Sequence, residues 1–151
     1  MTWHTRLVLA ADGPYGDGAI DNLVLDPAVH RTMGIAVLVA MVAASGHLAR
    51  LALRGKRLDR TARVLLALAQ VTLMVQALLG IKLLDQNMGW NQLYIHYIGG
   101  LIPLGLFLVA GWFGRSDSVG RTRLLAALTT AGMLSASMAF FIGRAYVNRG
   151  L

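Results

Sequence analysis

The sequence predicts an all-α, polytopic membrane protein in which four transmembrane helices form an antiparallel bundle. Hydrophobic residues make up 56% of the 151-residue chain, which is more than a soluble domain of this size can bury under a polar surface. They are concentrated in four blocks, each close to the roughly 20 residues that a helix needs to cross the hydrocarbon core. The blocks are residues 33–53, 64–84, 93–113 and 124–146.

The basic residues indicate which way the chain is threaded. Nine of the 14 Lys and Arg lie in or beside two connectors, within residues 50–63 and 115–123, where only Asp59 and Asp117 accompany them. Short loops rich in Lys and Arg stay cytoplasmic. Both termini and the 85–92 loop are therefore expected outside, which makes this a multi-pass protein of the cytoplasmic membrane. The net charge of +7 then reflects topology, so the lipid bilayer is an expected partner and nucleic acid is not.

The first part of the chain differs in composition from the rest. Residues 1–26 contain several glycines and four aspartates, and we expect them to form an irregular outer segment ahead of a transmembrane domain over residues 27–151. Asp26-Pro27 is typical of a helix start, with Asp as N-cap and Pro at the first helical position. The first helix should therefore run from Pro27 to about Arg54.

Three short connections separate the predicted helices. Gly55-Lys56 indicates a tight inner turn, after which Asp59 can cap the second helix. Residues 89–91 are expected to form the outer turn, with Asn91 as the next cap, and residues 114–120 the second inner turn. Connections this short place successive helices side by side and antiparallel.

The last helix carries small residues at every fourth position, a pattern that lets helix backbones approach closely in lipid. The stripe consists of Ala127, Ala131, Ser135, Ala139 and Gly143. It can pack within this chain, or it can dock onto another membrane subunit or a second copy of the chain. Both interpretations are open.

Two histidines are expected at similar depth on the outer side, His30 at the entry of the first helix and His96 about one turn into the third. They can be ordinary interfacial histidines. They also fit bis-imidazole haem ligation, in which the porphyrin lies between two helices of a bundle. His47 is about 25 Å further along the first helix and belongs to the inner side, where an interfacial position beside Arg50 explains it.

Other residues near the histidine pair fit the same interpretation. Arg31, Lys82 and Arg144 lie at its level and can meet the propionates of a haem, although such cations also extend to the interface and Lys82 can pair with Asp85. Gly99 and Gly100 remove side-chain bulk beside His96. Gln70 and Gln76, in the middle of the second helix, can form hydrogen bonds between helices, which we favour, or contact a quinone or a substrate.

These motifs resemble one half of the heme A synthase family over about residues 23–113. In order, they are the His30-Arg31 pair, the basic stretch 50–63, the Gln76…Leu79-Gly80 pattern and His96 near the start of the next helix. In that family a histidine pair of one four-helix half binds a b-type haem. The resemblance thus implies that His30 and His96 are axial ligands of haem b, and that two halves form a complete enzyme.

The chain departs from that family in two respects. It has half the length, and Pro27 stands where the catalytic half carries a carboxylate three residues before its first histidine. The sequence contains no glutamate or cysteine at all, so no catalytic residue is assigned and an enzymatic role is uncertain.

Three functions remain open. The leading hypothesis is a membrane cytochrome b-like subunit that transfers electrons within a larger complex. The alternatives are a half-size, dimeric heme A synthase-like enzyme and a haem-free structural or assembly subunit.

Overall fold

The computed structural model describes residues 23–86, 94–112 and 118–148, and four helices make up nearly all of this part. They are α1 (Pro27–Leu53), α2 (Arg60–Asp85), α3 (Tyr94–Trp112) and α4 (Val119–Asn148). Each is long and apolar enough to cross a membrane. The predicted all-α bundle of four membrane-spanning helices is confirmed.

Two predicted helix starts are present with their caps. The Asp26 side chain accepts a hydrogen bond from the Ala28 amide at 2.7 Å, and Pro27 occupies the first turn of α1. Asp59 accepts from the Ala62 amide at 2.7 Å and caps α2. These carboxylates satisfy amides that have no partner inside the helix.

The turns agree with the prediction where the structure describes them. Gly55 has φ +61°, a backbone conformation that glycine adopts without strain, and it completes the turn between α1 and α2. The turn predicted at 114–120 ends earlier than expected, because α4 already begins at Val119. Ser118 precedes this helix, and its Oγ accepts a hydrogen bond from the Arg121 amide at 3.2 Å. The expected turn at 89–91 and the Asn91 cap lie outside the described residues.

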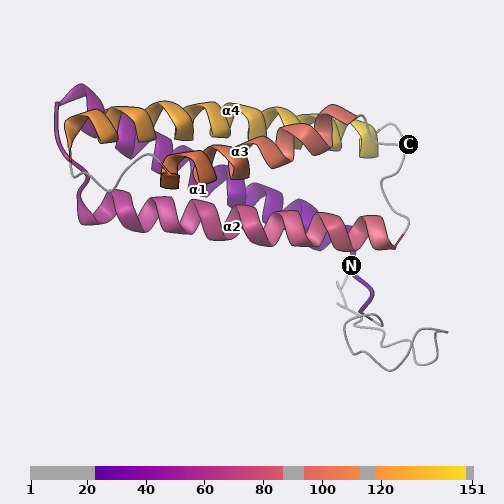
Figure 1. Ribbon diagram of the computed structural model, residues 1–151. Coiled ribbons are helices and arrows are strands. Elements are labelled where there is room, and N and C mark those ends of the chain that lie inside the picture. Colours follow the sequence, from indigo (N-terminus) through magenta and orange to yellow (C-terminus); the bar gives the residue numbers. More distant parts are fainter. Residues whose placement is uncertain (1–22, 87–93, 113–117, 149–151) are drawn as a thin grey trace, which may run out of the picture.

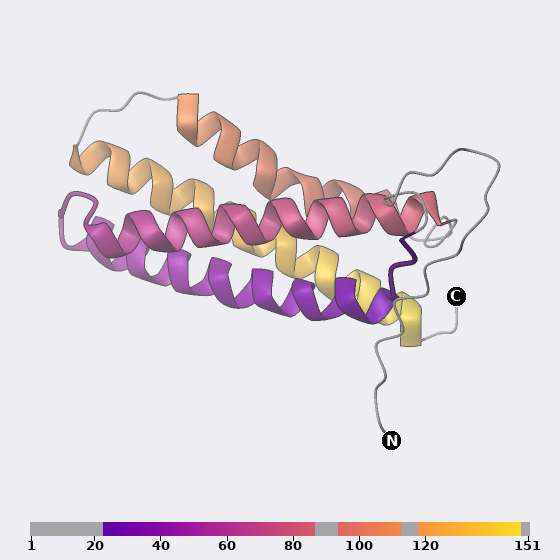
Figure 2. The ribbon, with the colours of Figure 1, turned by 90° about the horizontal axis from the view of Figure 1, so that it is seen from below.

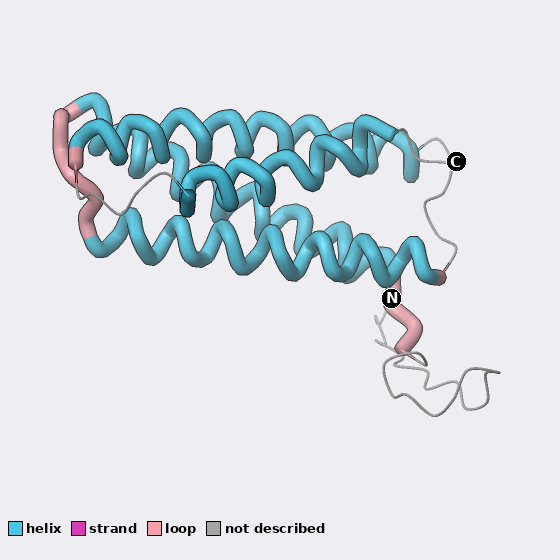
Figure 3. The backbone as a smooth tube through the Cα atoms, viewed as in Figure 1, coloured by secondary structure: helices cyan, strands magenta, loops and turns pink. Residues whose placement is uncertain are grey.

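The helices are antiparallel, and their pairing is unequal (Figures 1 and 3). α4 packs against both α1 and α3, α2 packs against α1, and α2 and α3 have the least contact of the four pairs. Figure 2 shows α3 diverging from α2 toward one end of the bundle. We call this end, which carries residues 54–59 and the first turn of α4, the basic end. At the opposite end α1 begins and α4 finishes.

Small residues bring α1 and α4 together. Met41 of α1 is fully buried, and a Cβ added to Gly132 would lie only 3.1 Å from its Cε. Met41 therefore fills the space that the glycine leaves open. The outward faces carry large apolar side chains such as Val39, Leu108 and Phe141, all more than 60% exposed, as expected for helices surrounded by lipid.

The small-residue stripe of α4 is divided between two environments. Its half toward the opposite end packs against α3: Ser135 Oγ donates to the Gly99 carbonyl at 2.9 Å, and Ala139 Cβ lies 3.2 Å from the position of a Cβ on Gly99. Ala127 and Ala131, nearer the basic end, are exposed. Packing within the chain thus accounts for Ser135, Ala139 and Gly143 and leaves Ala127 and Ala131 uncovered.

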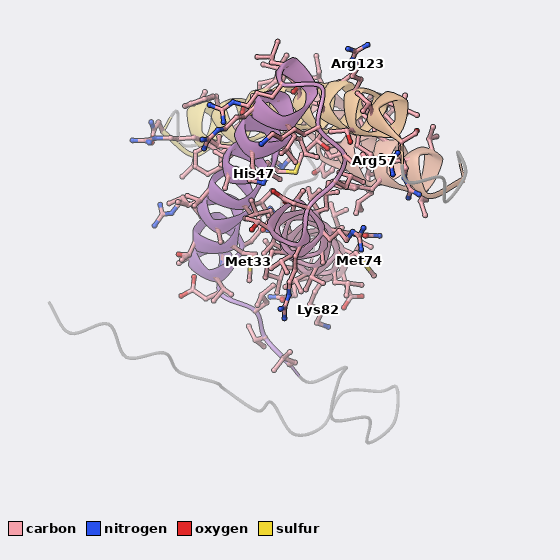
Figure 4. All side chains as sticks on the ribbon, turned by 90° about the vertical axis from the view of Figure 1, so that its left-hand side faces the viewer. Met33, His47, Arg57, Met74, Lys82 and Arg123 are labelled. Carbon is pink, nitrogen blue, oxygen red and sulfur yellow. The ribbon has the colours of Figure 1, made fainter. Side chains whose placement is uncertain are left out.

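A polar contact joins α1 to the start of α2 at the basic end (Figure 4, seen toward this end). His47 Nε2 lies 3.0 and 3.1 Å from the two carboxylate oxygens of Asp59. His47 therefore has a specific partner, which the sequence interpretation of it as an interfacial residue beside Arg50 did not include. The pKa of Asp59 is lowered, mainly because its carboxylate accepts the Ala62 amide and secondly because it bonds His47.

This lowered pKa predicts a pH-dependent contribution of Asp59 to stability. The contribution should be fully present above the unfolded-state pKa of the carboxyl and lost as the pH falls through its lower folded-state value. Asp59→Asn, which keeps a capping side chain, should therefore lower the thermal unfolding midpoint in detergent at neutral pH and match the wild type in acid. Asp26→Asn is the control, since an amide also caps and no histidine is involved. A difference between Asp59→Asn and wild type that persists in acid would contradict the assignment.

The threading prediction can be tested because the chain has no native cysteine. A single Cys at Thr61, in the first turn of α2, should react with a membrane-impermeant maleimide only after cells are permeabilised. A Cys at Asn148, at the end of α4, should react on intact cells, because the connectors richest in Lys and Arg stay inside. The reverse labelling pattern would invert the orientation.

Candidate functional site

A cavity of 680 Å³ lies between the four helices in the half of the bundle away from the basic end. Cavities that bind small molecules and cofactors typically measure about 300–1,000 Å³. Both histidines of the predicted pair line it, His30 from α1 and His96 from α3. The structure therefore brings together two side chains that are 66 positions apart in the sequence.

His30 lies against α2. Its Nε2 is 3.1 Å from the Gln76 side-chain nitrogen, and its ring edge occupies the space beside Gly80, where an added Cβ would come within 3.2 Å of Cε1. His30 Nδ1 and Gln76 Oε1 are both buried and have no hydrogen-bond partner among the described residues. Buried polar atoms without partners are uncommon, and they often mark a place where a further group is bound.

His96 lies against α4, and its tautomer follows from its contacts. Its Nδ1 is 2.8 Å from the backbone carbonyl of Ala139. A carbonyl only accepts, so Nδ1 carries the proton and donates it. In the neutral ring Nε2 then has a free lone pair. Histidines that bind metals commonly have this arrangement, in which the second nitrogen donates to a carbonyl and fixes the ring.

Four glycines make room for these side chains, in a reciprocal pattern. The His30 ring lies over Gly80 of α2, while a Cβ on Gly34 of α1 would meet Phe140 of α4 at 3.1 Å and Gln76 of α2 at 3.5 Å. His96 of α3 lies over Gly143 of α4, where an added Cβ would come within 2.8 Å of the ring, and Ala139 packs on Gly99 of α3. Each glycine thus receives a side chain from the neighbouring antiparallel helix.

The cations predicted around the histidine pair are placed differently from one another. Arg31 and Arg144 line the cavity and are exposed. Lys82 lies outside its lining and pairs with Asp85, with Nζ 2.6 Å from Oδ2. The sequence had left this pairing open as an alternative for Lys82.

The two glycines predicted beside His96, Gly99 and Gly100, have different environments. Gly100 lines the cavity, whereas Gly99 is buried against α4 and its carbonyl accepts the Ser135 hydroxyl. Adjacent residues of a helix point in directions about 100° apart, and here the rotation of α3 directs Gly100 to the cavity and Gly99 to α4.

Sequence reasoning did not assign Gly34, Gly80 and Gly143 to the site. One signal was present: Gly34 follows His30, Gly80 follows Gln76, and Gly100 follows His96, each by four positions. Residues at this spacing share a helix face. A polar residue and a glycine on the same face in three helices indicate a shared interior site.

No protein-family model, curated protein sequence or solved structure matches the chain significantly.

The close contact at Gly143 predicts a strong effect of one added methyl group. Gly143→Ala should destabilise the protein by about 1–3 kcal/mol, because the new Cβ overlaps an imidazole held by its bond to Ala139. Gly105→Ala is the matched control: an added Cβ there meets no atom within 4 Å, and alanine favours helix. Thermal unfolding in detergent compares the two variants. Equal effects would show that His96 is not packed against Gly143.

Proposed function

We propose that this protein is a cytochrome b-like membrane subunit that binds one b-type haem in the cavity between His30 and His96 and transfers electrons within a larger complex. One observation carries the proposal: two imidazoles from different helices line one cavity large enough for a cofactor. The resemblance of the His30-Arg31, Gln76…Gly80 and His96 motifs to one half of the heme A synthase family supports it.

The residues present fit such a group. The iron of a haem needs only two protein ligands, because the porphyrin supplies the rest, and histidine is a common axial ligand. His96 offers an Nε2 lone pair, and its Nδ1 donor bond to Ala139 fixes the ring. Among the described residues the buried Nδ1 of His30 has no hydrogen-bond partner, and its Nε2 bonds the side-chain amide of Gln76. When His30 acts as ligand through Nε2, that amide must give up this contact.

Arg31 and Arg144 are the side chains suited to hold carboxylates at this site. Both line the cavity and lie toward the opposite end of α1 and α4, where the helices leave the apolar core. Guanidinium groups bind carboxylates through paired, charge-assisted hydrogen bonds. They would therefore fix the propionate edge, with the apolar part of the cavity covering the rest.

Two axial imidazoles favour electron transfer over chemistry at the metal. When bound, a haem with both axial positions filled would supply one-electron transfer and no open coordination site. The described carboxylates at this end already have structural roles: Asp26 caps α1, and Asp85 pairs with Lys82. An enzymatic function in this chain alone is therefore not part of the proposal.

The partners follow from the same argument. An electron-transfer subunit needs a donor and an acceptor, supplied by other membrane subunits or by a second copy of the chain in the cytoplasmic membrane. Ala127 and Ala131, the exposed half of the α4 stripe, are the part of this stripe that remains open for such contact.

The proposal predicts a specific spectrum for the purified protein. Reconstitution with haemin should give a low-spin b-type reduced-minus-oxidised spectrum, because two imidazoles provide a strong ligand field. His30→Ala and His96→Ala should each abolish it. His47→Ala is the matched control, since His47 lies near the basic end and bonds Asp59 instead.

Two results would contradict the proposal. One is a folded wild-type protein that does not bind haemin, which would favour a haem-free structural role. The other is a low-spin spectrum that survives both His30→Ala and His96→Ala, which would place the cofactor elsewhere.

A further inference from the structure

A second cavity lies at the basic end and has a different character from the first. It measures 450 Å³ and is bordered by α2, α3 and the start of α4. Apolar residues form most of its wall, among them Leu66, Phe107 and Leu125. Three polar side chains also line it: Arg63, Gln70 and Arg121. The described histidines His30, His47 and His96 do not line it, so this cavity is separate from the candidate haem site.

The two arginines come from different helices and lie at the same level. Arg63 is in the first turn of α2, and Arg121 is in the first turn of α4. Both helices begin at the basic end, and long helical side chains lean toward the helix N-terminus. Both guanidinium groups are thus directed toward the membrane surface on the basic side.

Neither arginine has an acidic partner in the part of the chain that the structure describes. The ion pairs there are His47–Asp59 and Lys82–Asp85. The Nε of Arg121 is buried and forms no hydrogen bond within the described residues. A buried guanidinium donor without an acceptor is costly, so this N–H is suited to bind an anionic acceptor that enters the cavity.

Gln70 extends the polar lining into the apolar region. Arg63 and Gln70 are seven positions apart and therefore share one face of α2, with Gln70 about 10 Å deeper. Its side chain is exposed and makes no hydrogen bond to another described residue, so the interhelical bond expected for Gln70 from the sequence is not formed. An unpaired amide at membrane depth needs a polar group to bond.

We propose that this cavity binds the phosphate and upper acyl region of an anionic phospholipid in the leaflet on the basic side. The arginines would pair with the phosphate, Gln70 would bond a polar group below it, and the apolar wall between α2 and α3 would take an acyl chain. Basic pockets between membrane helices on the cytoplasmic side characteristically bind anionic headgroups. A free phosphate satisfies the arginines but leaves Gln70 and the apolar wall unused, so the lipid accounts for more of the lining.

The test uses the purified full chain in neutral detergent, with thermal unfolding measured as phosphatidylglycerol, phosphatidylcholine or inorganic phosphate is added. Phosphatidylglycerol should raise the unfolding midpoint in a saturable manner, and the other two should not. The double variant Arg63→Gln/Arg121→Gln should weaken the apparent affinity about tenfold or more, because each charge-assisted bond is lost. Gln70→Leu should weaken it less.

The matched control is Arg57→Gln/Arg123→Gln. Both of these arginines are exposed at the basic end, as Figure 4 shows, and neither lines the cavity. The control removes the same net charge, so it should keep phosphatidylglycerol binding close to wild type. If Arg63→Gln/Arg121→Gln fails to fold, Arg63→Lys/Arg121→Lys is used instead. It keeps both charges but loses the planar guanidinium groups, and it should bind phosphatidylglycerol measurably more weakly than the wild type.

Three outcomes would overturn the proposal. If Arg57→Gln/Arg123→Gln lost as much affinity for phosphatidylglycerol as Arg63→Gln/Arg121→Gln, the basic end would attract anionic lipid through its overall charge and not through a specific site. Stabilisation by inorganic phosphate equal to that by the lipid would mean a free-anion site. The third outcome is no effect of phosphatidylglycerol on the folded wild type. The haem spectrum depends on neither arginine, so failure here leaves the proposed function to its own test.

Discussion

Close packing between α1 and α4 determines how the other helices are arranged. Met41 fits over Gly132, and a larger residue at that position would separate the two backbones. In lipid no hydrophobic force holds helices together, so contact over small residues must do so. With α1 and α4 paired at the centre, α2 packs on α1 and α3 packs on α4. The remaining boundary, between α2 and α3, has the least contact, and both cavities border it.

The same principle shapes the cavity with the histidines. A helix that contributes an imidazole needs a neighbouring helix with no side chain at the same level. Gly80 leaves this space for His30, and Gly143 leaves it for His96. The absence of a side chain at Gly143 lets His96 approach α4 and reach the Ala139 carbonyl through Nδ1, and this bond does not use the Nε2 lone pair. Glycine here contributes by allowing close approach, while the hydrogen bonds give the rings a defined orientation. Polar chemistry inside an apolar bundle depends on both.

The two ends of the bundle differ electrostatically, and the difference suits two kinds of ligand. At the basic end the Asp59 carboxylate accepts the Ala62 amide and bonds His47, and Arg63 and Arg121 have no acidic partner among the described residues. At the opposite end Lys82 is paired, and Arg31 and Arg144 remain directed at the first cavity. Each cavity is thus apolar within and cationic where it approaches the membrane surface. This arrangement suits amphipathic ligands whose acidic part stays near water.

The sequence alone determined the four helices and the helix ends marked by Asp26, Gly55 and Asp59. Hydrophobic block length predicts the spans, and local rules predict the caps at Asp26 and Asp59 and the turn at Gly55, because each depends on neighbours only a few positions away. It also indicated that His30 and His96 have similar depth, since depth follows from position along a helix. Only the tertiary structure decided which faces meet: that Gly100 lines the cavity and Gly99 does not, that Lys82 turns to Asp85, and that Arg63 and Arg121 share a second cavity. These outcomes depend on the rotation of each helix about its axis, which is set by how small and large residues of different helices interlock.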